Sequence, residues 1–437
     1  MSFLSTLIWA AAATVAGGIV LAYWLAFRRR ERQNRERADE AVKLGLSRPM
    51  GQYPFIDPAI CIGCGACVRA CPEKDVLGVV SGLAMVINGA RCMGIGQCAR
   101  ACPVGAIELA LGDLKSRADV PALDHQNQTN VPGLYVAGEL GGLALIRNAV
   151  QQGRDTVRWV ARDLAIHPGP KDPELLELAI VGAGPAGLSA ALSAVECGLS
   201  YAVFEQQADL GGTIYNFPRR KLTHTQPVEL PLYGLLRKDE YTKEELLELF
   251  GELVSRHRLA IRFGERVQQL LRDEDRFLLR TAKGLYLARR VLLAMGRRGT
   301  PRRLGVPGEN LSKVMYQVRD ADQYRHKKIL CVGGGDSAVE AALGLARQPG
   351  NEVSLSYRQD GFYRIKRKNL DLLETSIERG RIRPILRSEV REIEAEKVRL
   401  ATSSGELALA NDYVFVLIGG EPPFPFLREA GVAFGGG

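Results

Sequence analysis

The sequence predicts a multidomain protein of the α/β class, with two α/β domains that each contain a strand–turn–helix unit, a small cysteine-rich α+β domain and an apolar N-terminal helix. Three observations predict this organisation. Two segments have the pattern of buried strand, glycine turn and helix, seven of the nine cysteines lie between Cys61 and Cys102, and residues 1–27 carry no charged side chain. A chain of 437 residues is too long for one ordinary core, and 46% hydrophobic residues exclude wholesale disorder.

Residues 1–27 predict a transmembrane helix, because about 25 residues at about 1.5 Å each cross a hydrocarbon core of about 30 Å with some tilt. The basic run 28–37 follows, so we expect the rest of the chain on the cytoplasmic side of the inner (cytoplasmic) membrane, as a single-pass protein. Residues 28–50 would form a basic stalk. The run 28–37 supplies +4 of the net +9, so no nucleic-acid partner is expected. A buried helix of a soluble core is the alternative.

The cysteines form a doubled pattern. The first copy is C-x₂-C-x₂-C-x₃-C-P, ending at Pro72, and the second copy ends at Pro103. Such runs are typical of iron–sulfur ligation. A clustered, odd number of cysteines also argues against a secreted disulfide framework. Zinc is the alternative, but zinc knuckles do not carry this doubled pattern.

Over residues 51–112 the chain resembles the bacterial-type two-cluster ferredoxins. In that family the fourth cysteine of each copy ligates the cluster of the other copy, which implies two ligand sets. A first [4Fe–4S] cluster would be held by Cys61, Cys64, Cys67 and Cys102, and a second cluster by Cys71, Cys92 and Cys98.

The second copy departs from the family pattern at Ile95, which stands where a fourth cysteine is expected and cannot ligate iron. Three outcomes stay open for this site. It holds a [3Fe–4S] cluster, it holds a [4Fe–4S] cluster with a ligand other than cysteine, or it is empty.

The first glycine turn lies in the run LAIVGAGPAGLSAALSA, which begins at Leu178. A strand before such a turn and a helix after it make the motif meaningful, since the glycines let a pyrophosphate approach the helix N-terminus. Glu205 ends the next strand, where a carboxylate would bind a ribose. The candidate contacts of this Rossmann-like site are Gly182, Gly184, Pro185, Ala186, Gly187, Glu205, Gln206, Gly212 and Gly296.

The glycine turn after Leu178 is the first of two such fingerprints. The second fingerprint follows the strand KKILCV, and its candidate contacts are Gly333, Gly335, Asp336, Ser337 and Ala338. Between the two fingerprints, VLLAMG and the residues after Gly296 look like a peptide that crosses between domains. Over residues 176–437 this combination resembles the pyridine nucleotide-disulfide oxidoreductase superfamily, in its thioredoxin-reductase-like branch. The resemblance implies an FAD-binding domain over 171–305, an NAD(P)-binding domain over 306–410 and a return to the FAD domain over 411–437.

The chain departs from this family in two ways. The stretch 316–328 has no C-x-x-C, so direct dithiol–disulfide chemistry is not expected. The closing motif T-x-x-x-x-x-Y-x-x-G-D, expected near the C-terminus, is found upstream over residues 129–139, with Glu139 in place of the aspartate. We infer a circular permutation in which 113–170 closes the flavin site, with Gly138, Glu139 and Ala144 beside the cofactor. The alternative is that 113–170 is only a linker.

The nicotinamide preference is predicted from the strand over 352–358, which ends without a carboxylate and is followed by arginines. Arg358 and Arg364 then favour a 2′-phosphate, and hence NADPH over NADH.

A nicotinamide site, a flavin site and iron–sulfur clusters on one chain suggest an electron-transfer enzyme. We expect a membrane-anchored NAD(P)H-dependent FAD/iron–sulfur oxidoreductase with an unidentified redox partner or small-molecule acceptor. No catalytic acid–base pair is predicted, because the five histidines form no recognisable constellation. Two other functions stay open: an electron-input subunit like the glutamate synthase small subunit, and a redox sensor that does not cycle. The sequence leaves open whether the chain forms a homodimer and in which direction electrons flow.

Overall fold

The structure is a computed structural model, and it describes residues 3–43, 51–112, 118–169, 172–297, 299–363 and 365–435. The chain divides into two compact units, Met1–Gly112 and Asp113–Gly437, each of which is described here by itself.

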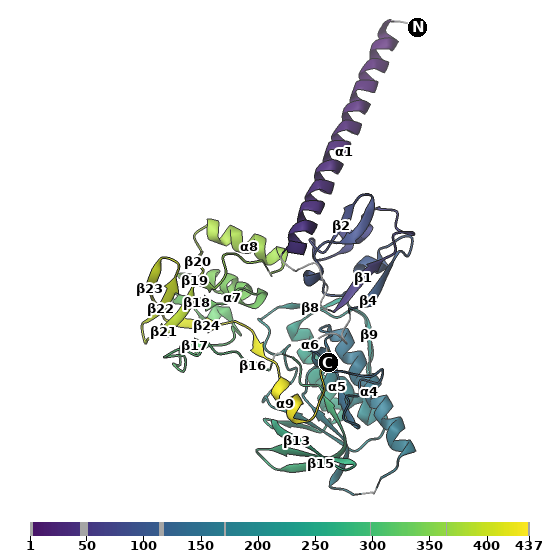
Figure 1. Ribbon diagram of the computed structural model, residues 1–437, viewed down its shortest axis with the longest axis vertical. Helices are drawn as coiled ribbons and strands as arrows, with labels where there is room; N and C mark the ends of the chain where they lie inside the picture. Colours follow the sequence, from purple (N-terminus) through teal and green to yellow (C-terminus); the bar gives the residue numbers. More distant parts are fainter. Residues whose placement is uncertain are drawn as a thin grey trace. The chain divides into compact units, whose positions relative to one another are not determined.

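The first unit begins with one continuous helix, α1 (Phe3–Lys43), of 41 residues (Figure 1). It contains both the apolar segment and the first part of the basic stalk, so residue 27 marks a change in composition and not a break in the helix. By length and composition the helix could cross a membrane, and none of its most apolar stretch is buried by the described part of the chain.

The rest of the first unit is a small α+β domain. Strand β1 (Gln52–Ile56) pairs antiparallel with β4 (Ile107–Leu111), and β2 (Leu77–Val80) forms a hairpin with β3 (Leu83–Val86). The short helices α2 (Ala66–Ala70) and α3 (Gln97–Arg100) and the turn η1 (Gly89–Arg91) complete the domain. The core is small and includes several of the cysteines themselves.

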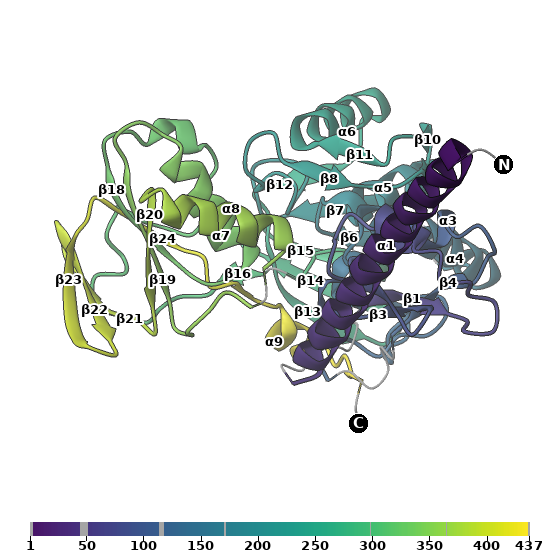
Figure 2. The ribbon, with the colours of Figure 1, turned by 90° about the horizontal axis from the view of Figure 1, so that it is seen from above.

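The second unit contains a seven-stranded sheet in the order β12-β7-β6-β15-β14-β13, with β5 also on β15 (Figure 2). Its strands are β5 (Leu134–Val136), β6 (Leu175–Val181), β7 (Tyr201–Glu205), β12 (Ile261–Phe263), β13 (Val267–Asp273), β14 (Arg276–Thr281) and β15 (Leu285–Leu293). The helices of this domain are α4 (Ile146–Ile166), α5 (Pro185–Glu196) and α6 (Lys243–His257). Two small hairpins pair β8 (Leu222–His224) with β11 (Glu240–Thr242), and β9 (Val228–Leu230) with β10 (Gly234–Leu236).

The upstream segment, residues 118–169, forms part of this sheet. Strand β5 runs parallel to β15, with Val291 opposite Leu134 and Leu293 opposite Val136. After the turn η2 (Gly138–Gly141), helix α4 packs against α5. The other end of the chain also reaches this segment, because the amide of Ala122 donates to the carbonyl of Ala433 at 2.9 Å.

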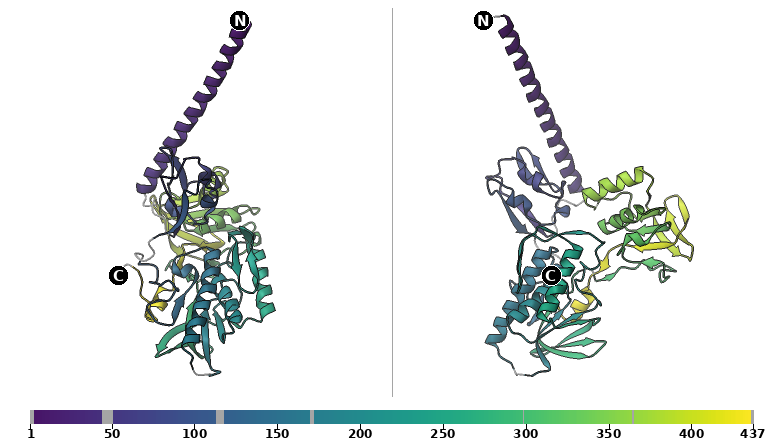
Figure 3. Two further views of the ribbon diagram at one scale, coloured as in Figure 1. Left: turned by 90° about the vertical axis from the view of Figure 1, so that its right-hand side faces the viewer. Right: turned by 180° about the vertical axis from the view of Figure 1, so that it is seen from behind.

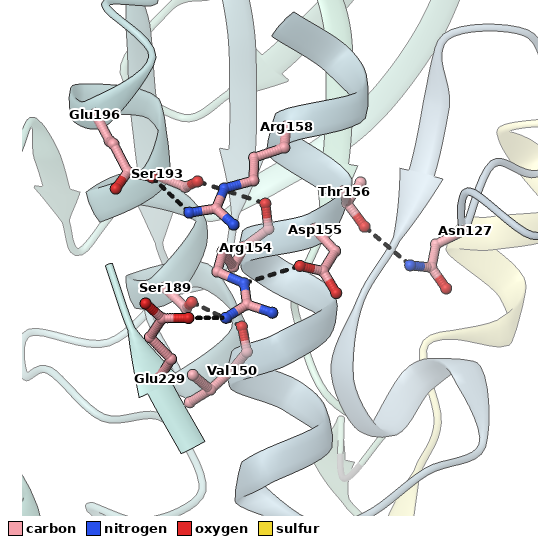
Figure 4. A network of polar contacts seen from close by, with 10 residues as sticks. All are labelled: Asn127, Val150, Arg154, Asp155, Thr156, Arg158, Ser189, Ser193, Glu196 and Glu229. Carbon is pink, nitrogen blue, oxygen red and sulfur yellow. Dashed lines mark hydrogen bonds and ion pairs between the residues drawn. The ribbon is translucent and has the colours of Figure 1, made fainter. Parts of the chain in front are cut away.

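Helix α4 contacts its neighbours through hydrogen bonds and an ion pair as well as through apolar packing (Figure 4). Ser189 of α5 is fully buried and donates to the carbonyl oxygen of Val150 at 2.7 Å. Arg154 pairs with Glu229 of β9 at 3.1 Å. Asn127 donates to the buried hydroxyl of Thr156 at 3.0 Å. The upstream segment is therefore integrated into the domain on several sides, which is not how a linker packs.

The second parallel sheet has the order β17-β24-β18-β19-β20. Its strands are β17 (Val314–Met315), β18 (Lys328–Val332), β19 (Glu352–Tyr357), β20 (Ile382–Leu386) and β24 (Tyr413–Val416), and it carries helices α7 (Asp336–Ala346) and α8 (Arg367–Glu378), with the turn η3 (Ala321–Gln323). An antiparallel sheet of β21 (Glu389–Ile393), β22 (Lys397–Thr402) and β23 (Gly405–Ala410) follows β20.

The expected return to the first domain at residue 411 is wrong. Strand β24 pairs with β18, with Leu330 opposite Val414, because its apolar side chains are buried in the second sheet. The chain returns to the first domain at β25 (Gly420–Glu421). This strand pairs with β16 (Thr300–Pro301), which belongs to the peptide after Gly296 that crosses between the domains. Helix α9 (Phe424–Glu429) then buries Leu427 against the first sheet.

We expect Gly153→Ala to destabilise the first domain of the second unit. A Cβ at Gly153 would lie 2.2 Å from the carbonyl oxygen of Ala186, so α4 must move away from α5, at a cost of about 1–3 kcal/mol. Denaturant unfolding followed by the fluorescence of Trp159 on α4 measures this cost.

The matched control is Gly251→Ala in α6, where a Cβ meets nothing within 4 Å. It should stabilise its helix by up to about 1 kcal/mol, since alanine is the better helix former. Equal effects of the two substitutions would contradict the close packing of α4 on α5.

Candidate functional site

The first fingerprint forms a tight turn between β6 and α5. Gly182 has φ +107°, and a Cβ there would lie 2.6 Å from the carbonyl oxygen of Ala294. A Cβ at Gly187 would lie 1.8 Å from the carbonyl oxygen of Gly182. Glycine is therefore required at both positions, and helix α5 begins directly at the turn with Pro185 in its first position.

Four other glycines lie around this turn. A Cβ at Gly184 meets nothing within 4 Å, so the space in front of it is free for a ligand backbone. Gly212 approaches Gly184 to 3.3 Å, and Gly138 of the upstream segment approaches Ala186 to 3.2 Å, both measured from a built Cβ. Gly296 lies 4.0 Å from the hydroxyl of Thr213 by the same measure. Segments far apart in sequence thus converge on the N-terminus of α5, which fits a pyrophosphate.

Glu205 ends β7 beside the same turn and is buried. Its carboxylate accepts from the amide of Ala183 at 2.7 Å and from the amide of Gln207 at 2.8 Å. The neighbouring Gln206 is exposed. The two amides fix the carboxylate at the carboxyl end of the strand, where a ribose hydroxyl pair would be bound.

The closing motif places Gly138 and Glu139 directly after β5. Gly138 has φ +82°, and its amide donates to the side chain of Gln152 on α4 at 2.8 Å. Glu139 follows in the turn and is partly exposed, and Ala144 is exposed two residues before α4 begins. The N-terminus of α4 is therefore available to stabilise negative charge on a bound group.

The second fingerprint borders a cavity of about 980 Å³. Gly333 has φ +142°, and a Cβ there would lie 2.4 Å from the carbonyl oxygen of Leu417. At Gly335, the residue before α7, a Cβ meets nothing within 4 Å. This combination of one constrained and one open glycine matches that of the first fingerprint.

The other predicted residues of this site differ in what they do. Ser337 and Arg358 line the cavity. Asp336 also lines it, but its carboxylate accepts from the amide of Lys366 at 2.9 Å and from Asn369 at 2.6 Å, so it anchors the start of α8. Ala338 is buried beneath Gly333 and lets helix and strand approach closely. Arg364 lies outside the described residues.

Several residues that line the cavity were missed by sequence reasoning. Lys221 of the first domain pairs with Glu340 of α7 at 2.8 Å across it. Three arginines line it as well, from the crossing peptide and from β21: Arg302, Arg303 and Arg391. None of these lies within a recognisable motif, because the residues come from separate elements brought together only by the fold.

The cysteines surround two small cavities. Cys61, Cys64, Cys67 and Cys102 line one, and Cys71, Cys92 and Cys98 line the other. These are the two ligand sets implied if the fourth cysteine of each copy ligates the cluster of the other copy. Within the described residues, no three His, Cys, Asp or Glu side chains are arranged to hold a single metal ion.

Backbone amides donate to the sulfur atoms of both sets. The amide of Ala84 lies 3.4 Å from the Sγ of Cys61, that of Ala106 lies 3.3 Å from Cys102, and that of Gly94 lies 3.4 Å from Cys92. Such bonds stabilise thiolate charge, so the donor set fits a group held by thiolates.

Burial raises the pKa of the thiols around the second cavity. The pKa of Cys71 is raised to about 12, and those of Cys92 and Cys98 are raised as well. These thiols are thus protonated at neutral pH before a metal binds, and binding must release their protons. Ile95 lines the same cavity and is only 6% exposed, so an aliphatic side chain stands beside the three thiols.

Two family models match the chain. The model described as pyridine nucleotide-disulphide oxidoreductase matches residues 179–435, and the model described as 4Fe-4S dicluster domain matches residues 53–103. The first match starts after the upstream segment 118–169, although the structure places β5 and α4 in the same domain.

Several known proteins are similar to the chain over the same part. A ferredoxin–NADP reductase of Ignicoccus hospitalis is 32% identical over 265 residues, which are 58% of this chain and 80% of the relative. A bacilliredoxin reductase of Bacillus subtilis is 29% identical over 259 residues, 58% of this chain and 79% of the relative. The solved bacillithiol disulfide reductase of Staphylococcus aureus is 26% identical, with a TM-score of 0.53 over 59% of this chain and 80% of that one.

The two fingerprints and the doubled cysteine pattern are thus confirmed as family features. The matched residues exceed half of the chain, and the glycine turns at their centre have the geometry of dinucleotide sites. The chain therefore belongs to the pyridine nucleotide-disulphide oxidoreductase family of flavin oxidoreductases, and it carries a 4Fe-4S dicluster domain in the same polypeptide.

Proposed function

We propose that this protein is a membrane-anchored NADPH-dependent FAD/iron–sulfur oxidoreductase whose ferredoxin domain is its own electron carrier. One observation carries the proposal: two glycine-turn sites and two cysteine-lined cavities occur on a single chain. The names of the relatives support it, since several are ferredoxin–NADP reductases. Here the ferredoxin is part of the reductase chain.

FAD would be held at the first fingerprint. The open face of Gly184 and the N-terminus of α5 would receive the pyrophosphate, and Glu205 the ribose of the adenosine. Glu139 would bind the ribityl chain, and α4 would direct its positive end toward the ring. A bound flavin supplies hydride acceptance from the nicotinamide and release of electrons one at a time.

The nicotinamide nucleotide would be held in the cavity beside the second fingerprint. Strand β19 ends at Tyr357 without a carboxylate, and Arg358 follows at the cavity wall. Arg391 lines the same cavity. Arginines bind phosphate in a bidentate manner, so we assign the site to NADPH in preference to NADH.

The seven cysteines would hold two clusters. The set with four thiols suits a [4Fe–4S] cluster. The second set has three thiols and Ile95, which suits a [3Fe–4S] cluster in which one corner of the cube is missing. The alternative [4Fe–4S] cluster would need a ligand other than cysteine.

Helix α1 would anchor the protein in the inner membrane. Its apolar part is not buried by any of the described residues, and six arginines follow that part within ten residues. The excess of positive charge favours a cytoplasmic location for the domains.

The proposal predicts which nucleotide reduces the protein. In an anaerobic titration of the purified chain, NADPH should bleach the flavin absorbance and then produce the EPR signals of reduced clusters. NADH should require roughly tenfold or higher concentrations, because it lacks the phosphate that the arginines bind.

The control for this titration is Arg358→Ala, which should weaken the response to NADPH and leave that to NADH unchanged. Flavin reduction without any reduction of the clusters would refute the internal electron path. Equal responses to both nucleotides would refute the assignment to NADPH.

The three-thiol site predicts the behaviour of Ile95→Cys. As isolated, the oxidised wild-type protein should show the EPR signal of a three-iron cluster, and it should contain about seven iron atoms. The substitution should add about one iron and remove that signal, because a cubane with a fourth thiolate is silent when oxidised.

Iron content and EPR of the oxidised protein measure both effects. An unchanged spectrum and iron count on Ile95→Cys would show that this loop does not ligate the cluster. About four iron atoms in the wild-type protein would mean that the second site is empty.

A further inference from the structure

We propose that the loop around the first cluster is an electron exit at the membrane surface, and that it reduces a lipophilic carrier of the quinone class. This inference names the acceptor for the proposed function and rests on it. It follows from how the ferredoxin domain is attached to α1 within the first unit (Figure 3).

The tip of the β2–β3 hairpin is bound to α1 just after its apolar part. Glu31 accepts from the amide of Ser81 at 3.0 Å, and Asn34 donates to the carbonyl of Val79 at 3.1 Å. Arg35 donates to the hydroxyl of Ser81 at 3.3 Å. Glu31 follows Phe27, the end of the uncharged run, by four residues, which is a rise of about 6 Å. The hairpin tip therefore lies at the depth of the lipid headgroups, whose layer is several Å thick.

The loop of the first cluster lies against this tip. A Cβ at Gly63 would lie 2.0 Å from the carbonyl oxygen of Gly82, so the two backbones are in direct contact. The amide of Ala84 also lies 3.4 Å from the Sγ of Cys61. The thiols that would hold the first cluster are thus next to the part of the domain nearest the membrane.

The second cavity lies farther along α1. It is lined by Val76 and Leu77 at the base of the hairpin, and the adjacent Asp75 pairs with Arg37 at 3.5 Å. Arg37 follows Glu31 by six residues, a rise of about 9 Å. The two clusters would therefore be ordered along the helix, with the first one on the membrane side.

The loop of the first cluster is apolar and exposed where a folded domain usually places polar groups. Ile62 is 63% exposed, Ile60 is 46% exposed and Val104 is 39% exposed, and Cys64 is exposed as well. Ile62 and Val104 line the cavity of the first cluster. An apolar rim around a redox centre fits an apolar partner, and the arginines 28–37 beside it suit anionic lipid headgroups.

The overall step balances with a quinone as the oxidant. NADPH gives up a hydride, which carries two electrons, and becomes NADP⁺. The quinone gains these two electrons, one at a time, together with two protons, and becomes the quinol. One proton equivalent comes from the hydride and the other from the aqueous phase, so the sum is NADPH + H⁺ + quinone → NADP⁺ + quinol.

The test uses the full chain in vesicles of phosphatidylcholine and phosphatidylglycerol that contain decylubiquinone. NADPH should reduce the quinone, and Ile62→Glu should slow this reaction at least about tenfold, since the charge opposes an apolar contact. EPR should show that NADPH still reduces the first cluster in this variant. The matched control is Leu285→Glu, which places the same charge on a side chain that is 59% exposed in the second unit and should have no effect.

Labelling gives a readout that is independent of turnover. A photoreactive azidoquinone should label the wild-type protein within residues 60–64 or 103–105, and Ile62→Glu should abolish the label. If Ile62→Glu loses its cluster, Ile60→Glu serves as the second variant. Label confined to other residues, or quinone reduction unaffected by both variants, would overturn the inference.

The inference and the proposed function can fail separately. If NADPH reduces both clusters but not the quinone, the proposed function stands and the exit to a lipophilic carrier is refuted, in favour of a soluble acceptor. If NADPH does not reduce the clusters at all, the proposed function itself fails.

Discussion

The fold of the second unit depends on the insertion of the upstream segment beside β15 and α5. Strand β5 occupies the half of β15 that β14 leaves unpaired, and α4 covers α5 closely enough that Gly153 admits no side chain. Buried serines of α5 donate to the backbone of α4 (Figure 4). Without this segment the apolar face of α5 and the edge of β15 would be exposed to water, at a cost of about 25 cal/mol per Å². The segment is thus a structural requirement of the domain, although the matched family region begins after it.

The position of this segment in the sequence also determines which domains follow each other along the chain. The ferredoxin domain ends at Gly112, and β5 of the flavin-type domain begins at Leu134. The cysteine-rich domain is therefore the part of the chain that precedes the element that would close the flavin site. At the other end of the chain, Ala433 and Gly435 bond to residues 120–122.

Sequence reasoning worked best where local chemistry is distinctive. The glycine turns, the doubled cysteine pattern and the displaced closing motif each carry their own signal, and β5 pairs where that motif implied. It failed for β24, because an apolar strand of four residues does not indicate which of the two sheets it joins. It also missed Lys221 and Glu340, which meet only after two domains fold. The contact between Glu31 and Ser81 had no signal in sequence, since a basic stalk and a hairpin turn are both ordinary surface segments.

If residues from the upstream segment complete the flavin site, Glu139→Ala must weaken FAD binding, and the dissociation constant of FAD measures this effect. Glu139 follows Gly138, which lies beside the first turn of α5. Loss of a hydrogen bond from a charged group should weaken FAD binding roughly tenfold, with iron content unchanged. The matched substitution Glu174→Ala, in the exposed loop before β6, should leave FAD binding as in the wild type. Equal FAD affinity of the wild-type protein and Glu139→Ala would show that the upstream segment does not complete the flavin site.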